Sequence, residues 1–144
     1  MLENHALFLS TKLSQIEVTN ILTEKLQPSI EYLTYNVKRY SVPVTLVLFY
    51  TTQDVSQLLK ESTRLTDVIN TIHIGDSYFN FVFLPFTDEV DSYTFIKHVE
   101  SSRLINIKHT YYYEKLPPVV YNHFNFINNY LFEISSKHEA PLLT

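Results

Sequence analysis

The apolar positions of this chain follow periods that predict helices and strands in alternation. Residues 44–50 are continuously apolar and β-branched, which is typical of a strand buried on both faces. Residues 68–74 and 78–86 are predicted as two further strands, and the turn residues 75–77 between them predict a hairpin. Residues 104–114 alternate in part, which predicts one more strand.

Amphipathic helices are predicted between these strands, because apolar side chains there recur every three or four residues. Proline and short polar residues mark their starts. The predicted helices are residues 29–39 after Pro28, a short helix capped by Asp54 with Leu65 among its inward positions, residues 89–100 with Tyr93 inward, and residues 119–137 after Pro117 and Pro118. This order of elements predicts one α+β domain with a ferredoxin-like, palm-type antiparallel sheet and helices mainly on one face.

The N-terminal segment, residues 1–27, has no place in this minimal fold. It nevertheless carries many large apolar side chains, namely Leu7, Phe8, Leu9, Leu13, Ile16, Val18, Ile21 and Leu22. Such side chains are costly to leave in water. We therefore expect residues 1–27 to pack on the domain formed by residues 28–144, or on a partner, with a homodimer as the expected assembly.

Composition excludes several classes of function. The 144 residues are 45% hydrophobic and 18% charged, as in a single globular domain, and no apolar run approaches the ~20 residues of a membrane span. Cysteine is absent, which excludes disulfides and Cys-ligated zinc and favours a cytoplasmic protein. A net charge of −4 argues against a nucleic-acid partner. The single glycine excludes glycine-rich phosphate loops and nucleophile elbows.

Short motifs along the chain resemble, in their order, the bacterial GGDEF (diguanylate cyclase) domain. The matching pieces are Lys38-Arg39-Tyr40 with Pro43, Arg64-x-x-Asp67, Gly75-Asp76, and Leu84-Pro85-x-Thr87-Asp88. The resemblance covers residues 28–137 in element order and residues 38–88 in motifs. It implies a nucleotidyl cyclase-like fold and a role in signal transduction.

The chain departs from this family where the family performs catalysis. Tyr50 and Thr52 occupy the positions at which the family has magnesium-binding carboxylates, and neither side chain offers a charged oxygen. The family's hairpin reads Gly-Gly-Asp/Glu-Glu-Phe, whereas this chain has Gly75, Asp76, Ser77 and Tyr78 before Phe79. Phosphoryl transfer with two metals needs clustered carboxylates. We therefore expect no enzyme activity, no bound metal and no cofactor.

The resemblance implies one candidate ligand site, because Arg64-x-x-Asp67 is similar to the site at which the family binds cyclic di-GMP. Arginine suits bidentate contact with phosphate and with guanine. The spacing from Asp67 to Gly75 is longer than in the family, and an ordinary surface arginine beside a strand-end aspartate is the competing interpretation.

Scattered histidines and an excess of aromatic residues leave a weaker alternative. His73 and His109 lie on predicted strands and are candidates for neighbours across the sheet, but no His pair has the spacing of a zinc site. An RNA-recognition-like surface would need aromatic rings on an open sheet face. The candidate rings are Phe79, Phe81, Phe83, Tyr111, Tyr112 and Tyr113, among 11 tyrosines and 10 phenylalanines.

The sequence thus predicts a catalytically inactive GGDEF-like signalling domain that acts through protein–protein interaction. A receptor for cyclic di-GMP or another nucleotide, using Arg64 and Asp67, is the alternative. A nucleic-acid binder with exposed aromatic rings is the second alternative.

Overall fold

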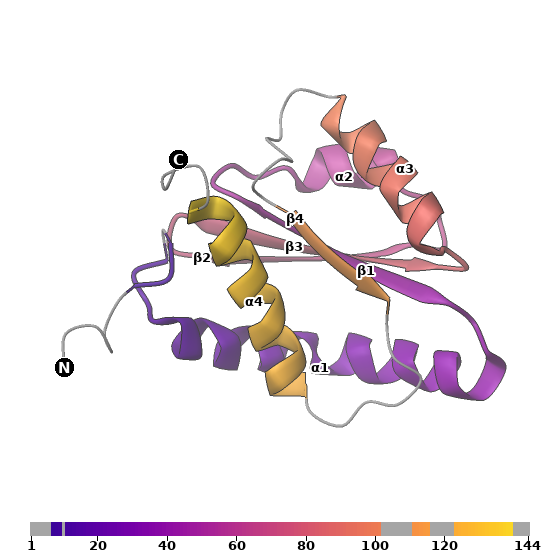
Figure 1. Ribbon diagram of the computed structural model, residues 1–144, viewed down its shortest axis with the longest axis horizontal. Helices are drawn as coiled ribbons and strands as arrows, with labels where there is room; N and C mark the ends of the chain where they lie inside the picture. Colours follow the sequence, from indigo (N-terminus) through magenta and orange to yellow (C-terminus); the bar gives the residue numbers. More distant parts are fainter. Residues whose placement is uncertain (1–6, 10, 102–110, 116–122, 140–144) are drawn as a thin grey trace.

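The computed structural model describes residues 7–9, 11–101, 111–115 and 123–139. Helices and strands follow the predicted order from α1 to α4 (Figure 1). Their bounds are α1 Gln15–Tyr40, β1 Val44–Thr51, α2 Ser56–Ser62, β2 Val68–Ile74, β3 Ser77–Pro85, α3 Glu89–Glu100, β4 Tyr111–Lys115 and α4 His123–Glu139. In these residues, no helix has the length and apolar character needed to cross a membrane.

The described strands form one four-stranded sheet in the order β2-β3-β1-β4. Every neighbouring pair is antiparallel, and the β1–β3 register places Leu48 opposite Phe81. A tight turn at Gly75 and Asp76 joins β2 to β3, and Gly75 adopts a φ of 59°, which glycine reaches without steric cost. This arrangement confirms the predicted ferredoxin-like class, with the hairpin embedded between two crossovers.

β1 is buried along its whole length, as its mainly apolar pattern predicted. Successive side chains of a strand point to opposite faces of the sheet, so β1 supplies both. Leu46, Leu48 and Tyr50 enter one hydrophobic cluster, whereas Val47 and Phe49 enter another. Both clusters therefore depend on β1.

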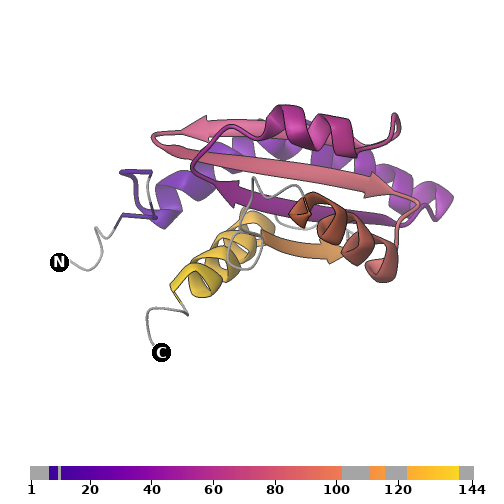
Figure 2. The same cartoon turned by 90° about the horizontal axis from the view of Figure 1, so that it is seen from above.

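Helices cover both faces of the sheet, which corrects the prediction of cover mainly on one face. α1 and α4 lie on one side and α2 and α3 on the other (Figure 1). Seen from above, α2 and α3 run over the same face of the sheet (Figure 2). The physical reason is that β1 and β3 are apolar on both faces, so each face needs a layer that excludes water.

α1 is longer than predicted, because it begins at Gln15 and continues through Pro28 to Tyr40. A capping box starts it: Glu17 N–H donates to Ser14 Oγ at 3.2 Å, and Ser14 N–H donates to Glu17 Oε1 at 2.9 Å. Pro28 lies on the exposed side of the helix. The predicted boundary between residues 27 and 28 therefore falls inside a continuous helix.

The first half of α1 contributes directly to the core. Val18, Leu22 and Leu26 are fully buried, and Ile30 extends the same stripe at four-residue steps. α1 also contacts α4, where Asn128 Oδ1 accepts hydrogen bonds from Gln15 Nε2 and Thr19 Oγ1, both at 2.9 Å. Burial against the sheet and α4 overrides the weak helical pattern of this segment.

Local details of the other helices differ from the predictions. Val55, not Asp54, is the N-cap residue of α2, although Asp54 Oδ1 accepts from Ser56 N–H at 3.0 Å and from Ser56 Oγ at 2.7 Å. These hydrogen bonds lower the pKa of the Asp54 carboxyl below its ordinary value. Leu65 and Tyr93, both predicted to face inward, are exposed. Leu65 lies beyond α2, which ends at Ser62. The Tyr93 ring lies at the surface, under the Lys97 ammonium.

The C-terminal elements agree with the predictions only in type. The predicted strand 104–114 corresponds to β4, Tyr111–Lys115, and its first part lies outside the described residues. The predicted helix 119–137 corresponds to α4, His123–Glu139. Pro117 and Pro118, which were expected to start that helix, also lie outside the described residues.

Replacing Leu22 by Ala should lower the free energy of unfolding by about 2–5 kcal/mol, because the change leaves a cavity among fully buried side chains. Urea denaturation followed by circular dichroism measures this value. Ile16→Ala is the matched control, since Ile16 is exposed on the same helix and its truncation should change stability by no more than about 0.5 kcal/mol. Equal effects of the two changes would contradict a core role for residues 15–27.

Candidate functional site

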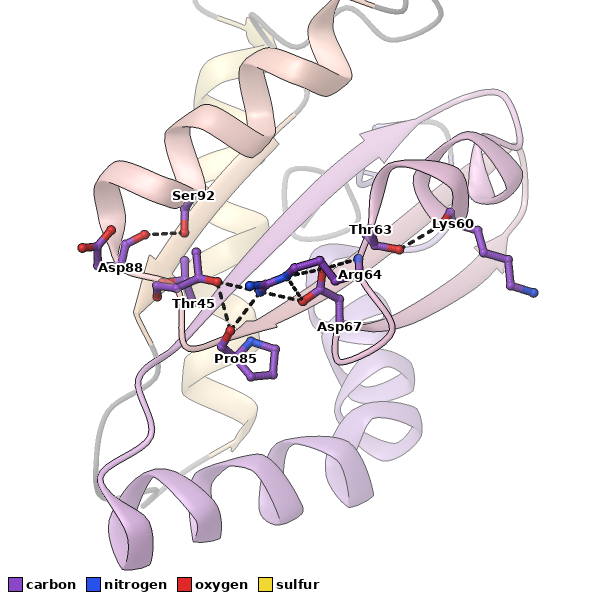
Figure 3. Close-up of polar contacts among 9 residues, drawn as sticks. Thr45, Lys60, Thr63, Arg64, Asp67, Pro85, Asp88 and Ser92 are labelled. Atoms are coloured by element: carbon purple, nitrogen blue, oxygen red, sulfur yellow. Dashed lines mark hydrogen bonds and ion pairs between the residues drawn. The ribbon is translucent and has the colours of Figure 1, made fainter.

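Arg64 and Asp67 form a closed turn between α2 and β2. The Asp67 N–H donates to Arg64 O at 3.1 Å, and the Arg64 N–H donates to Asp67 Oδ2 at 2.8 Å. The Arg64 guanidinium grips the same carboxylate, with Nη2 at 2.8 Å from Oδ1 and Nε at 3.2 Å from Oδ1 (Figure 3). Backbone and side chain together fix the orientation of Arg64.

The end of β3 provides the second anchor of Arg64. Nη2 also donates to Pro85 O at 2.9 Å and to Thr87 Oγ1 at 2.8 Å (Figure 3). Thr87 O in turn accepts from the buried Thr45 Oγ1 at 2.8 Å, which connects this turn to the first part of β1. Phe86 lies between Pro85 and Thr87 and has a φ of 59°, which is strained for a bulky residue. The flanking hydrogen bonds hold it there, and so does the hydrogen bond from the Phe86 N–H to Pro43 O at 2.6 Å.

The two partners of this ion pair differ strongly in exposure. The Arg64 side chain is 54% exposed and the Asp67 side chain only 2%. Nη1 of Arg64 donates no hydrogen bond to any residue that the structure describes. Exposed ion pairs contribute little to stability, but this carboxylate holds one edge of the guanidinium and leaves the other edge open to an anion or a base.

A pocket of about 280 Å³ opens beside this turn. Its walls come from the end of α2, the turn before β2, the end of β3 and the first turns of α3. The lining residues are Ser62, Arg64, Asp67, Leu84, Thr87, Asp91, Thr94 and Phe95. The structure therefore brings Arg64 and Asp67 together at a concave surface, while their role in ligand binding stays a prediction.

Of Tyr50 and Thr52, the two residues predicted to stand in place of metal-binding carboxylates, only Tyr50 belongs to the core. Tyr50 is 1% exposed, and its hydroxyl lies 2.9 Å from Ser77 Oγ in the buried start of the hairpin. The Phe8 ring packs edge-on against Tyr50 at 6.5 Å between centroids, and Phe79 lies at 5.5 Å. Thr52 is exposed beyond the end of β1. The segment before α1 thus covers this region with an aromatic ring.

The remaining hairpin residues lie apart from the pocket. Gly75 and Asp76 are exposed at the turn, and Tyr78 stacks on His73 with 4.2 Å between centroids and 2° between planes. His109, considered as a neighbour of His73, lies outside the described residues. Among the residues that the structure does describe, no group of three or more His, Cys, Asp or Glu could hold a metal ion.

Three of the six aromatic rings predicted for an RNA-binding face are buried in the core. Phe79, Phe81 and Phe83 are fully buried in the cluster beneath α1 and α4, so their rings are not available for stacking on bases. This corrects the expectation of an open sheet face at β3, because two helices cover that face. The side chains of residues 111–113 lie outside the description.

Thr87, Asp91 and Phe95 line the pocket but were not singled out as site residues. Thr87 and Asp91 lie in a stretch whose composition is explained by capping, and Asp88 indeed caps α3 through the Asp91 N–H at 2.9 Å. The available signal was the Leu84-Pro85-x-Thr87-Asp88 motif, which follows the predicted third strand.

Comparison with known proteins yields a likeness of fold. No family model matches the chain, and no curated protein matches it. The crystal structure of PelD 158-CT from Pseudomonas aeruginosa PAO1 is similar, with a TM-score of 0.54 and 16% sequence identity. The match covers 76% of this chain and 45% of that chain, so the present chain spans less than half of the PelD structure. The likeness supports the α+β architecture.

The Tyr50–Ser77 contact should be measurable as a structural coupling. A double-mutant cycle with Tyr50→Phe and Ser77→Ala should give an interaction energy of about 0.5–1.5 kcal/mol, because each single change leaves a buried hydroxyl without this partner. Urea denaturation of the four proteins gives this value. Tyr50→Phe combined with Thr94→Ala on the far face is the control and should be additive. Additive effects of Tyr50→Phe and Ser77→Ala would show that the two hydroxyls do not stabilise each other.

Proposed function

We propose that this chain is a non-catalytic, GGDEF-like signalling domain that binds cyclic di-GMP at the Arg64-x-x-Asp67 turn, with Arg64 in contact with the ligand and Asp67 holding Arg64 in place. One observation carries the proposal: the Arg64 guanidinium is held by Asp67, Pro85 and Thr87 beside a pocket, while Nη1 donates to none of the described residues. A side chain fixed in this way loses little conformational freedom on binding, which favours affinity.

The absence of catalysis is the second part of the proposal. Cyclase chemistry requires carboxylates that hold metal ions against the triphosphate. Tyr50 occupies the first such position as a buried ring, and Thr52 offers only a hydroxyl. Ligand binding and the absence of turnover together describe a receptor that reports ligand occupancy to a partner or a second copy.

A second surface supports contact of this receptor with a partner or a second copy. Tyr32, Tyr35 and Tyr40 are exposed on α1, and the Arg39 guanidinium lies 5.9 Å from the Tyr35 ring and 5.7 Å from the Tyr40 ring. Tyrosine and arginine are enriched at protein interfaces. Light scattering with and without cyclic di-GMP tests whether the assembly depends on the ligand.

Isothermal titration calorimetry with cyclic di-GMP tests the receptor proposal directly. We expect saturable binding by the full chain and a roughly ten- to one-hundred-fold loss of affinity in Arg64→Ala, because charged hydrogen bonds are lost. Lys25→Ala is the control, since it removes an exposed cation on α1, on the opposite side of the sheet from the pocket, and should leave affinity unchanged. No heat at high ligand concentration, or equal losses in the two variants, would refute the receptor.

Incubation with GTP and magnesium or manganese tests the second part. We expect neither cyclic di-GMP nor pyrophosphate above a control without protein, because no carboxylate occupies positions 50 and 52. Chromatography of the nucleotides and an enzymatic pyrophosphate assay measure both products. Turnover that disappears in Asp76→Asn would overturn the proposal, since Asp76 is the carboxylate that the hairpin retains.

A further inference from the structure

The Asp67 carboxylate is already fully engaged inside the protein. Oδ1 accepts from Arg64 Nη2 at 2.8 Å and from Nε at 3.2 Å, while Oδ2 accepts from the Arg64 backbone N–H at 2.8 Å and from Nε at 3.3 Å. The side chain is only 2% exposed. Asp67 therefore positions Arg64 and has little capacity left to contact a ligand.

Asp91 is the acceptor that remains open in the same pocket. It lies in the first turn of α3, is exposed, and lines the pocket together with Arg64. Its backbone N–H is capped by Asp88, but its carboxylate accepts no hydrogen bond from any residue in the described part of the chain. The two oxygens of this carboxylate can therefore accept hydrogen bonds from a ligand.

The other polar side chains of the pocket are already bonded to the backbone. Ser62 Oγ donates to Leu58 O at 3.0 Å, and Thr94 Oγ1 donates to Val90 O at 3.2 Å. Thr87 Oγ1 donates to Pro85 O at 3.0 Å. Arg64 Nη1 and the Asp91 carboxylate are thus the unengaged polar groups that a ligand would meet in the described walls.

We propose that Asp91 selects guanine over adenine in the ligand, with Arg64 Nη1 facing the ligand's phosphate; this inference rests on the receptor function proposed above. The Watson–Crick edge of guanine presents two neighbouring donors, N1–H and the N2 amino group, which fit the two oxygens of one carboxylate. Adenine presents one amino donor beside the N1 lone pair, which a carboxylate repels. The negative charge of the Asp91 carboxylate also repels the ligand's phosphate, which therefore lies on the Arg64 side.

The size of the pocket agrees with a single base. Its volume of about 280 Å³ lies just below that of pockets that hold whole drug-sized ligands, about 300–1,000 Å³. Leu84, which is 2% exposed, and the half-buried Phe95 supply apolar contact for a base. The rest of a dinucleotide would extend along the exposed guanidinium of Arg64.

Calorimetric titration of the full chain with cyclic di-GMP and with cyclic di-AMP tests the assignment. The wild type should bind cyclic di-GMP roughly ten-fold or more tightly than cyclic di-AMP, the discrimination expected of a bidentate base contact. Asp91→Asn should remove this preference and strengthen binding of cyclic di-AMP, because an amide offers one acceptor and one donor to adenine. Thermal melts verify that the variant folds.

Two further variants separate selection from positioning. Asp76→Asn, an exposed carboxylate outside the pocket, should keep the wild-type ratio of affinities. Asp67→Asn should weaken both ligands by a similar factor, since it loosens Arg64 without touching the base. A wild-type preference retained in Asp91→Asn, or lost in Asp67→Asn alone, would overturn the role of Asp91 while leaving the receptor intact. A wild-type chain that binds neither dinucleotide would refute the receptor function and this assignment together.

Discussion

Burial of β1 on both faces is the constraint on which the rest of this structure depends. All eight residues of the strand are buried, and alternate side chains enter two separate clusters. Each face then requires its own helical layer, which α1 with α4 and α2 with α3 provide (Figure 1). The long first helix is a consequence, because Val18 and Leu22 cover part of the face to which Leu46 and Leu48 belong.

The candidate site is connected to the same strand by hydrogen bonds. Thr45, a buried polar residue of β1, donates to Thr87 O, and Thr87 Oγ1 accepts from Arg64 Nη2. This chain of hydrogen bonds fixes the end of β3 against the Arg64 turn, so the pocket has walls that belong to the rigid sheet. A site on such a base presents Arg64 in one orientation, which is the requirement for selective binding. Tyr50, by contrast, lies in the core, where its hydroxyl is 2.9 Å from Ser77 Oγ.

Much of this arrangement follows from local sequence signals, and the exceptions have physical causes. The apolar run of β1 and the turn at Gly75 predicted the inner strand and the hairpin, because both signals are local. The start of α1 did not follow from the sequence, since Pro28 resembles a helix start and only tertiary burial reveals Leu22 as a core residue. Arg64 and Asp67 were named together through the resemblance of their motif, whereas the ion pair between them is seen only in the structure. The place of Asp91 was not, because the pocket forms only when α3 packs beside that turn.

Nuclear magnetic resonance of the ¹⁵N-labelled chain during titration with cyclic di-GMP shows whether the ligand binds at the Arg64 pocket, because it locates binding on the fold. We expect the Arg64 side-chain Nε–H and the amides of Thr87 and Asp91 to shift together and to saturate together. The amides of Tyr50 and Asp76, which do not line the pocket, should stay unchanged. Shifts confined to Tyr50 and Asp76, or an unperturbed Arg64 in the presence of bound ligand, would contradict binding at the Arg64 pocket.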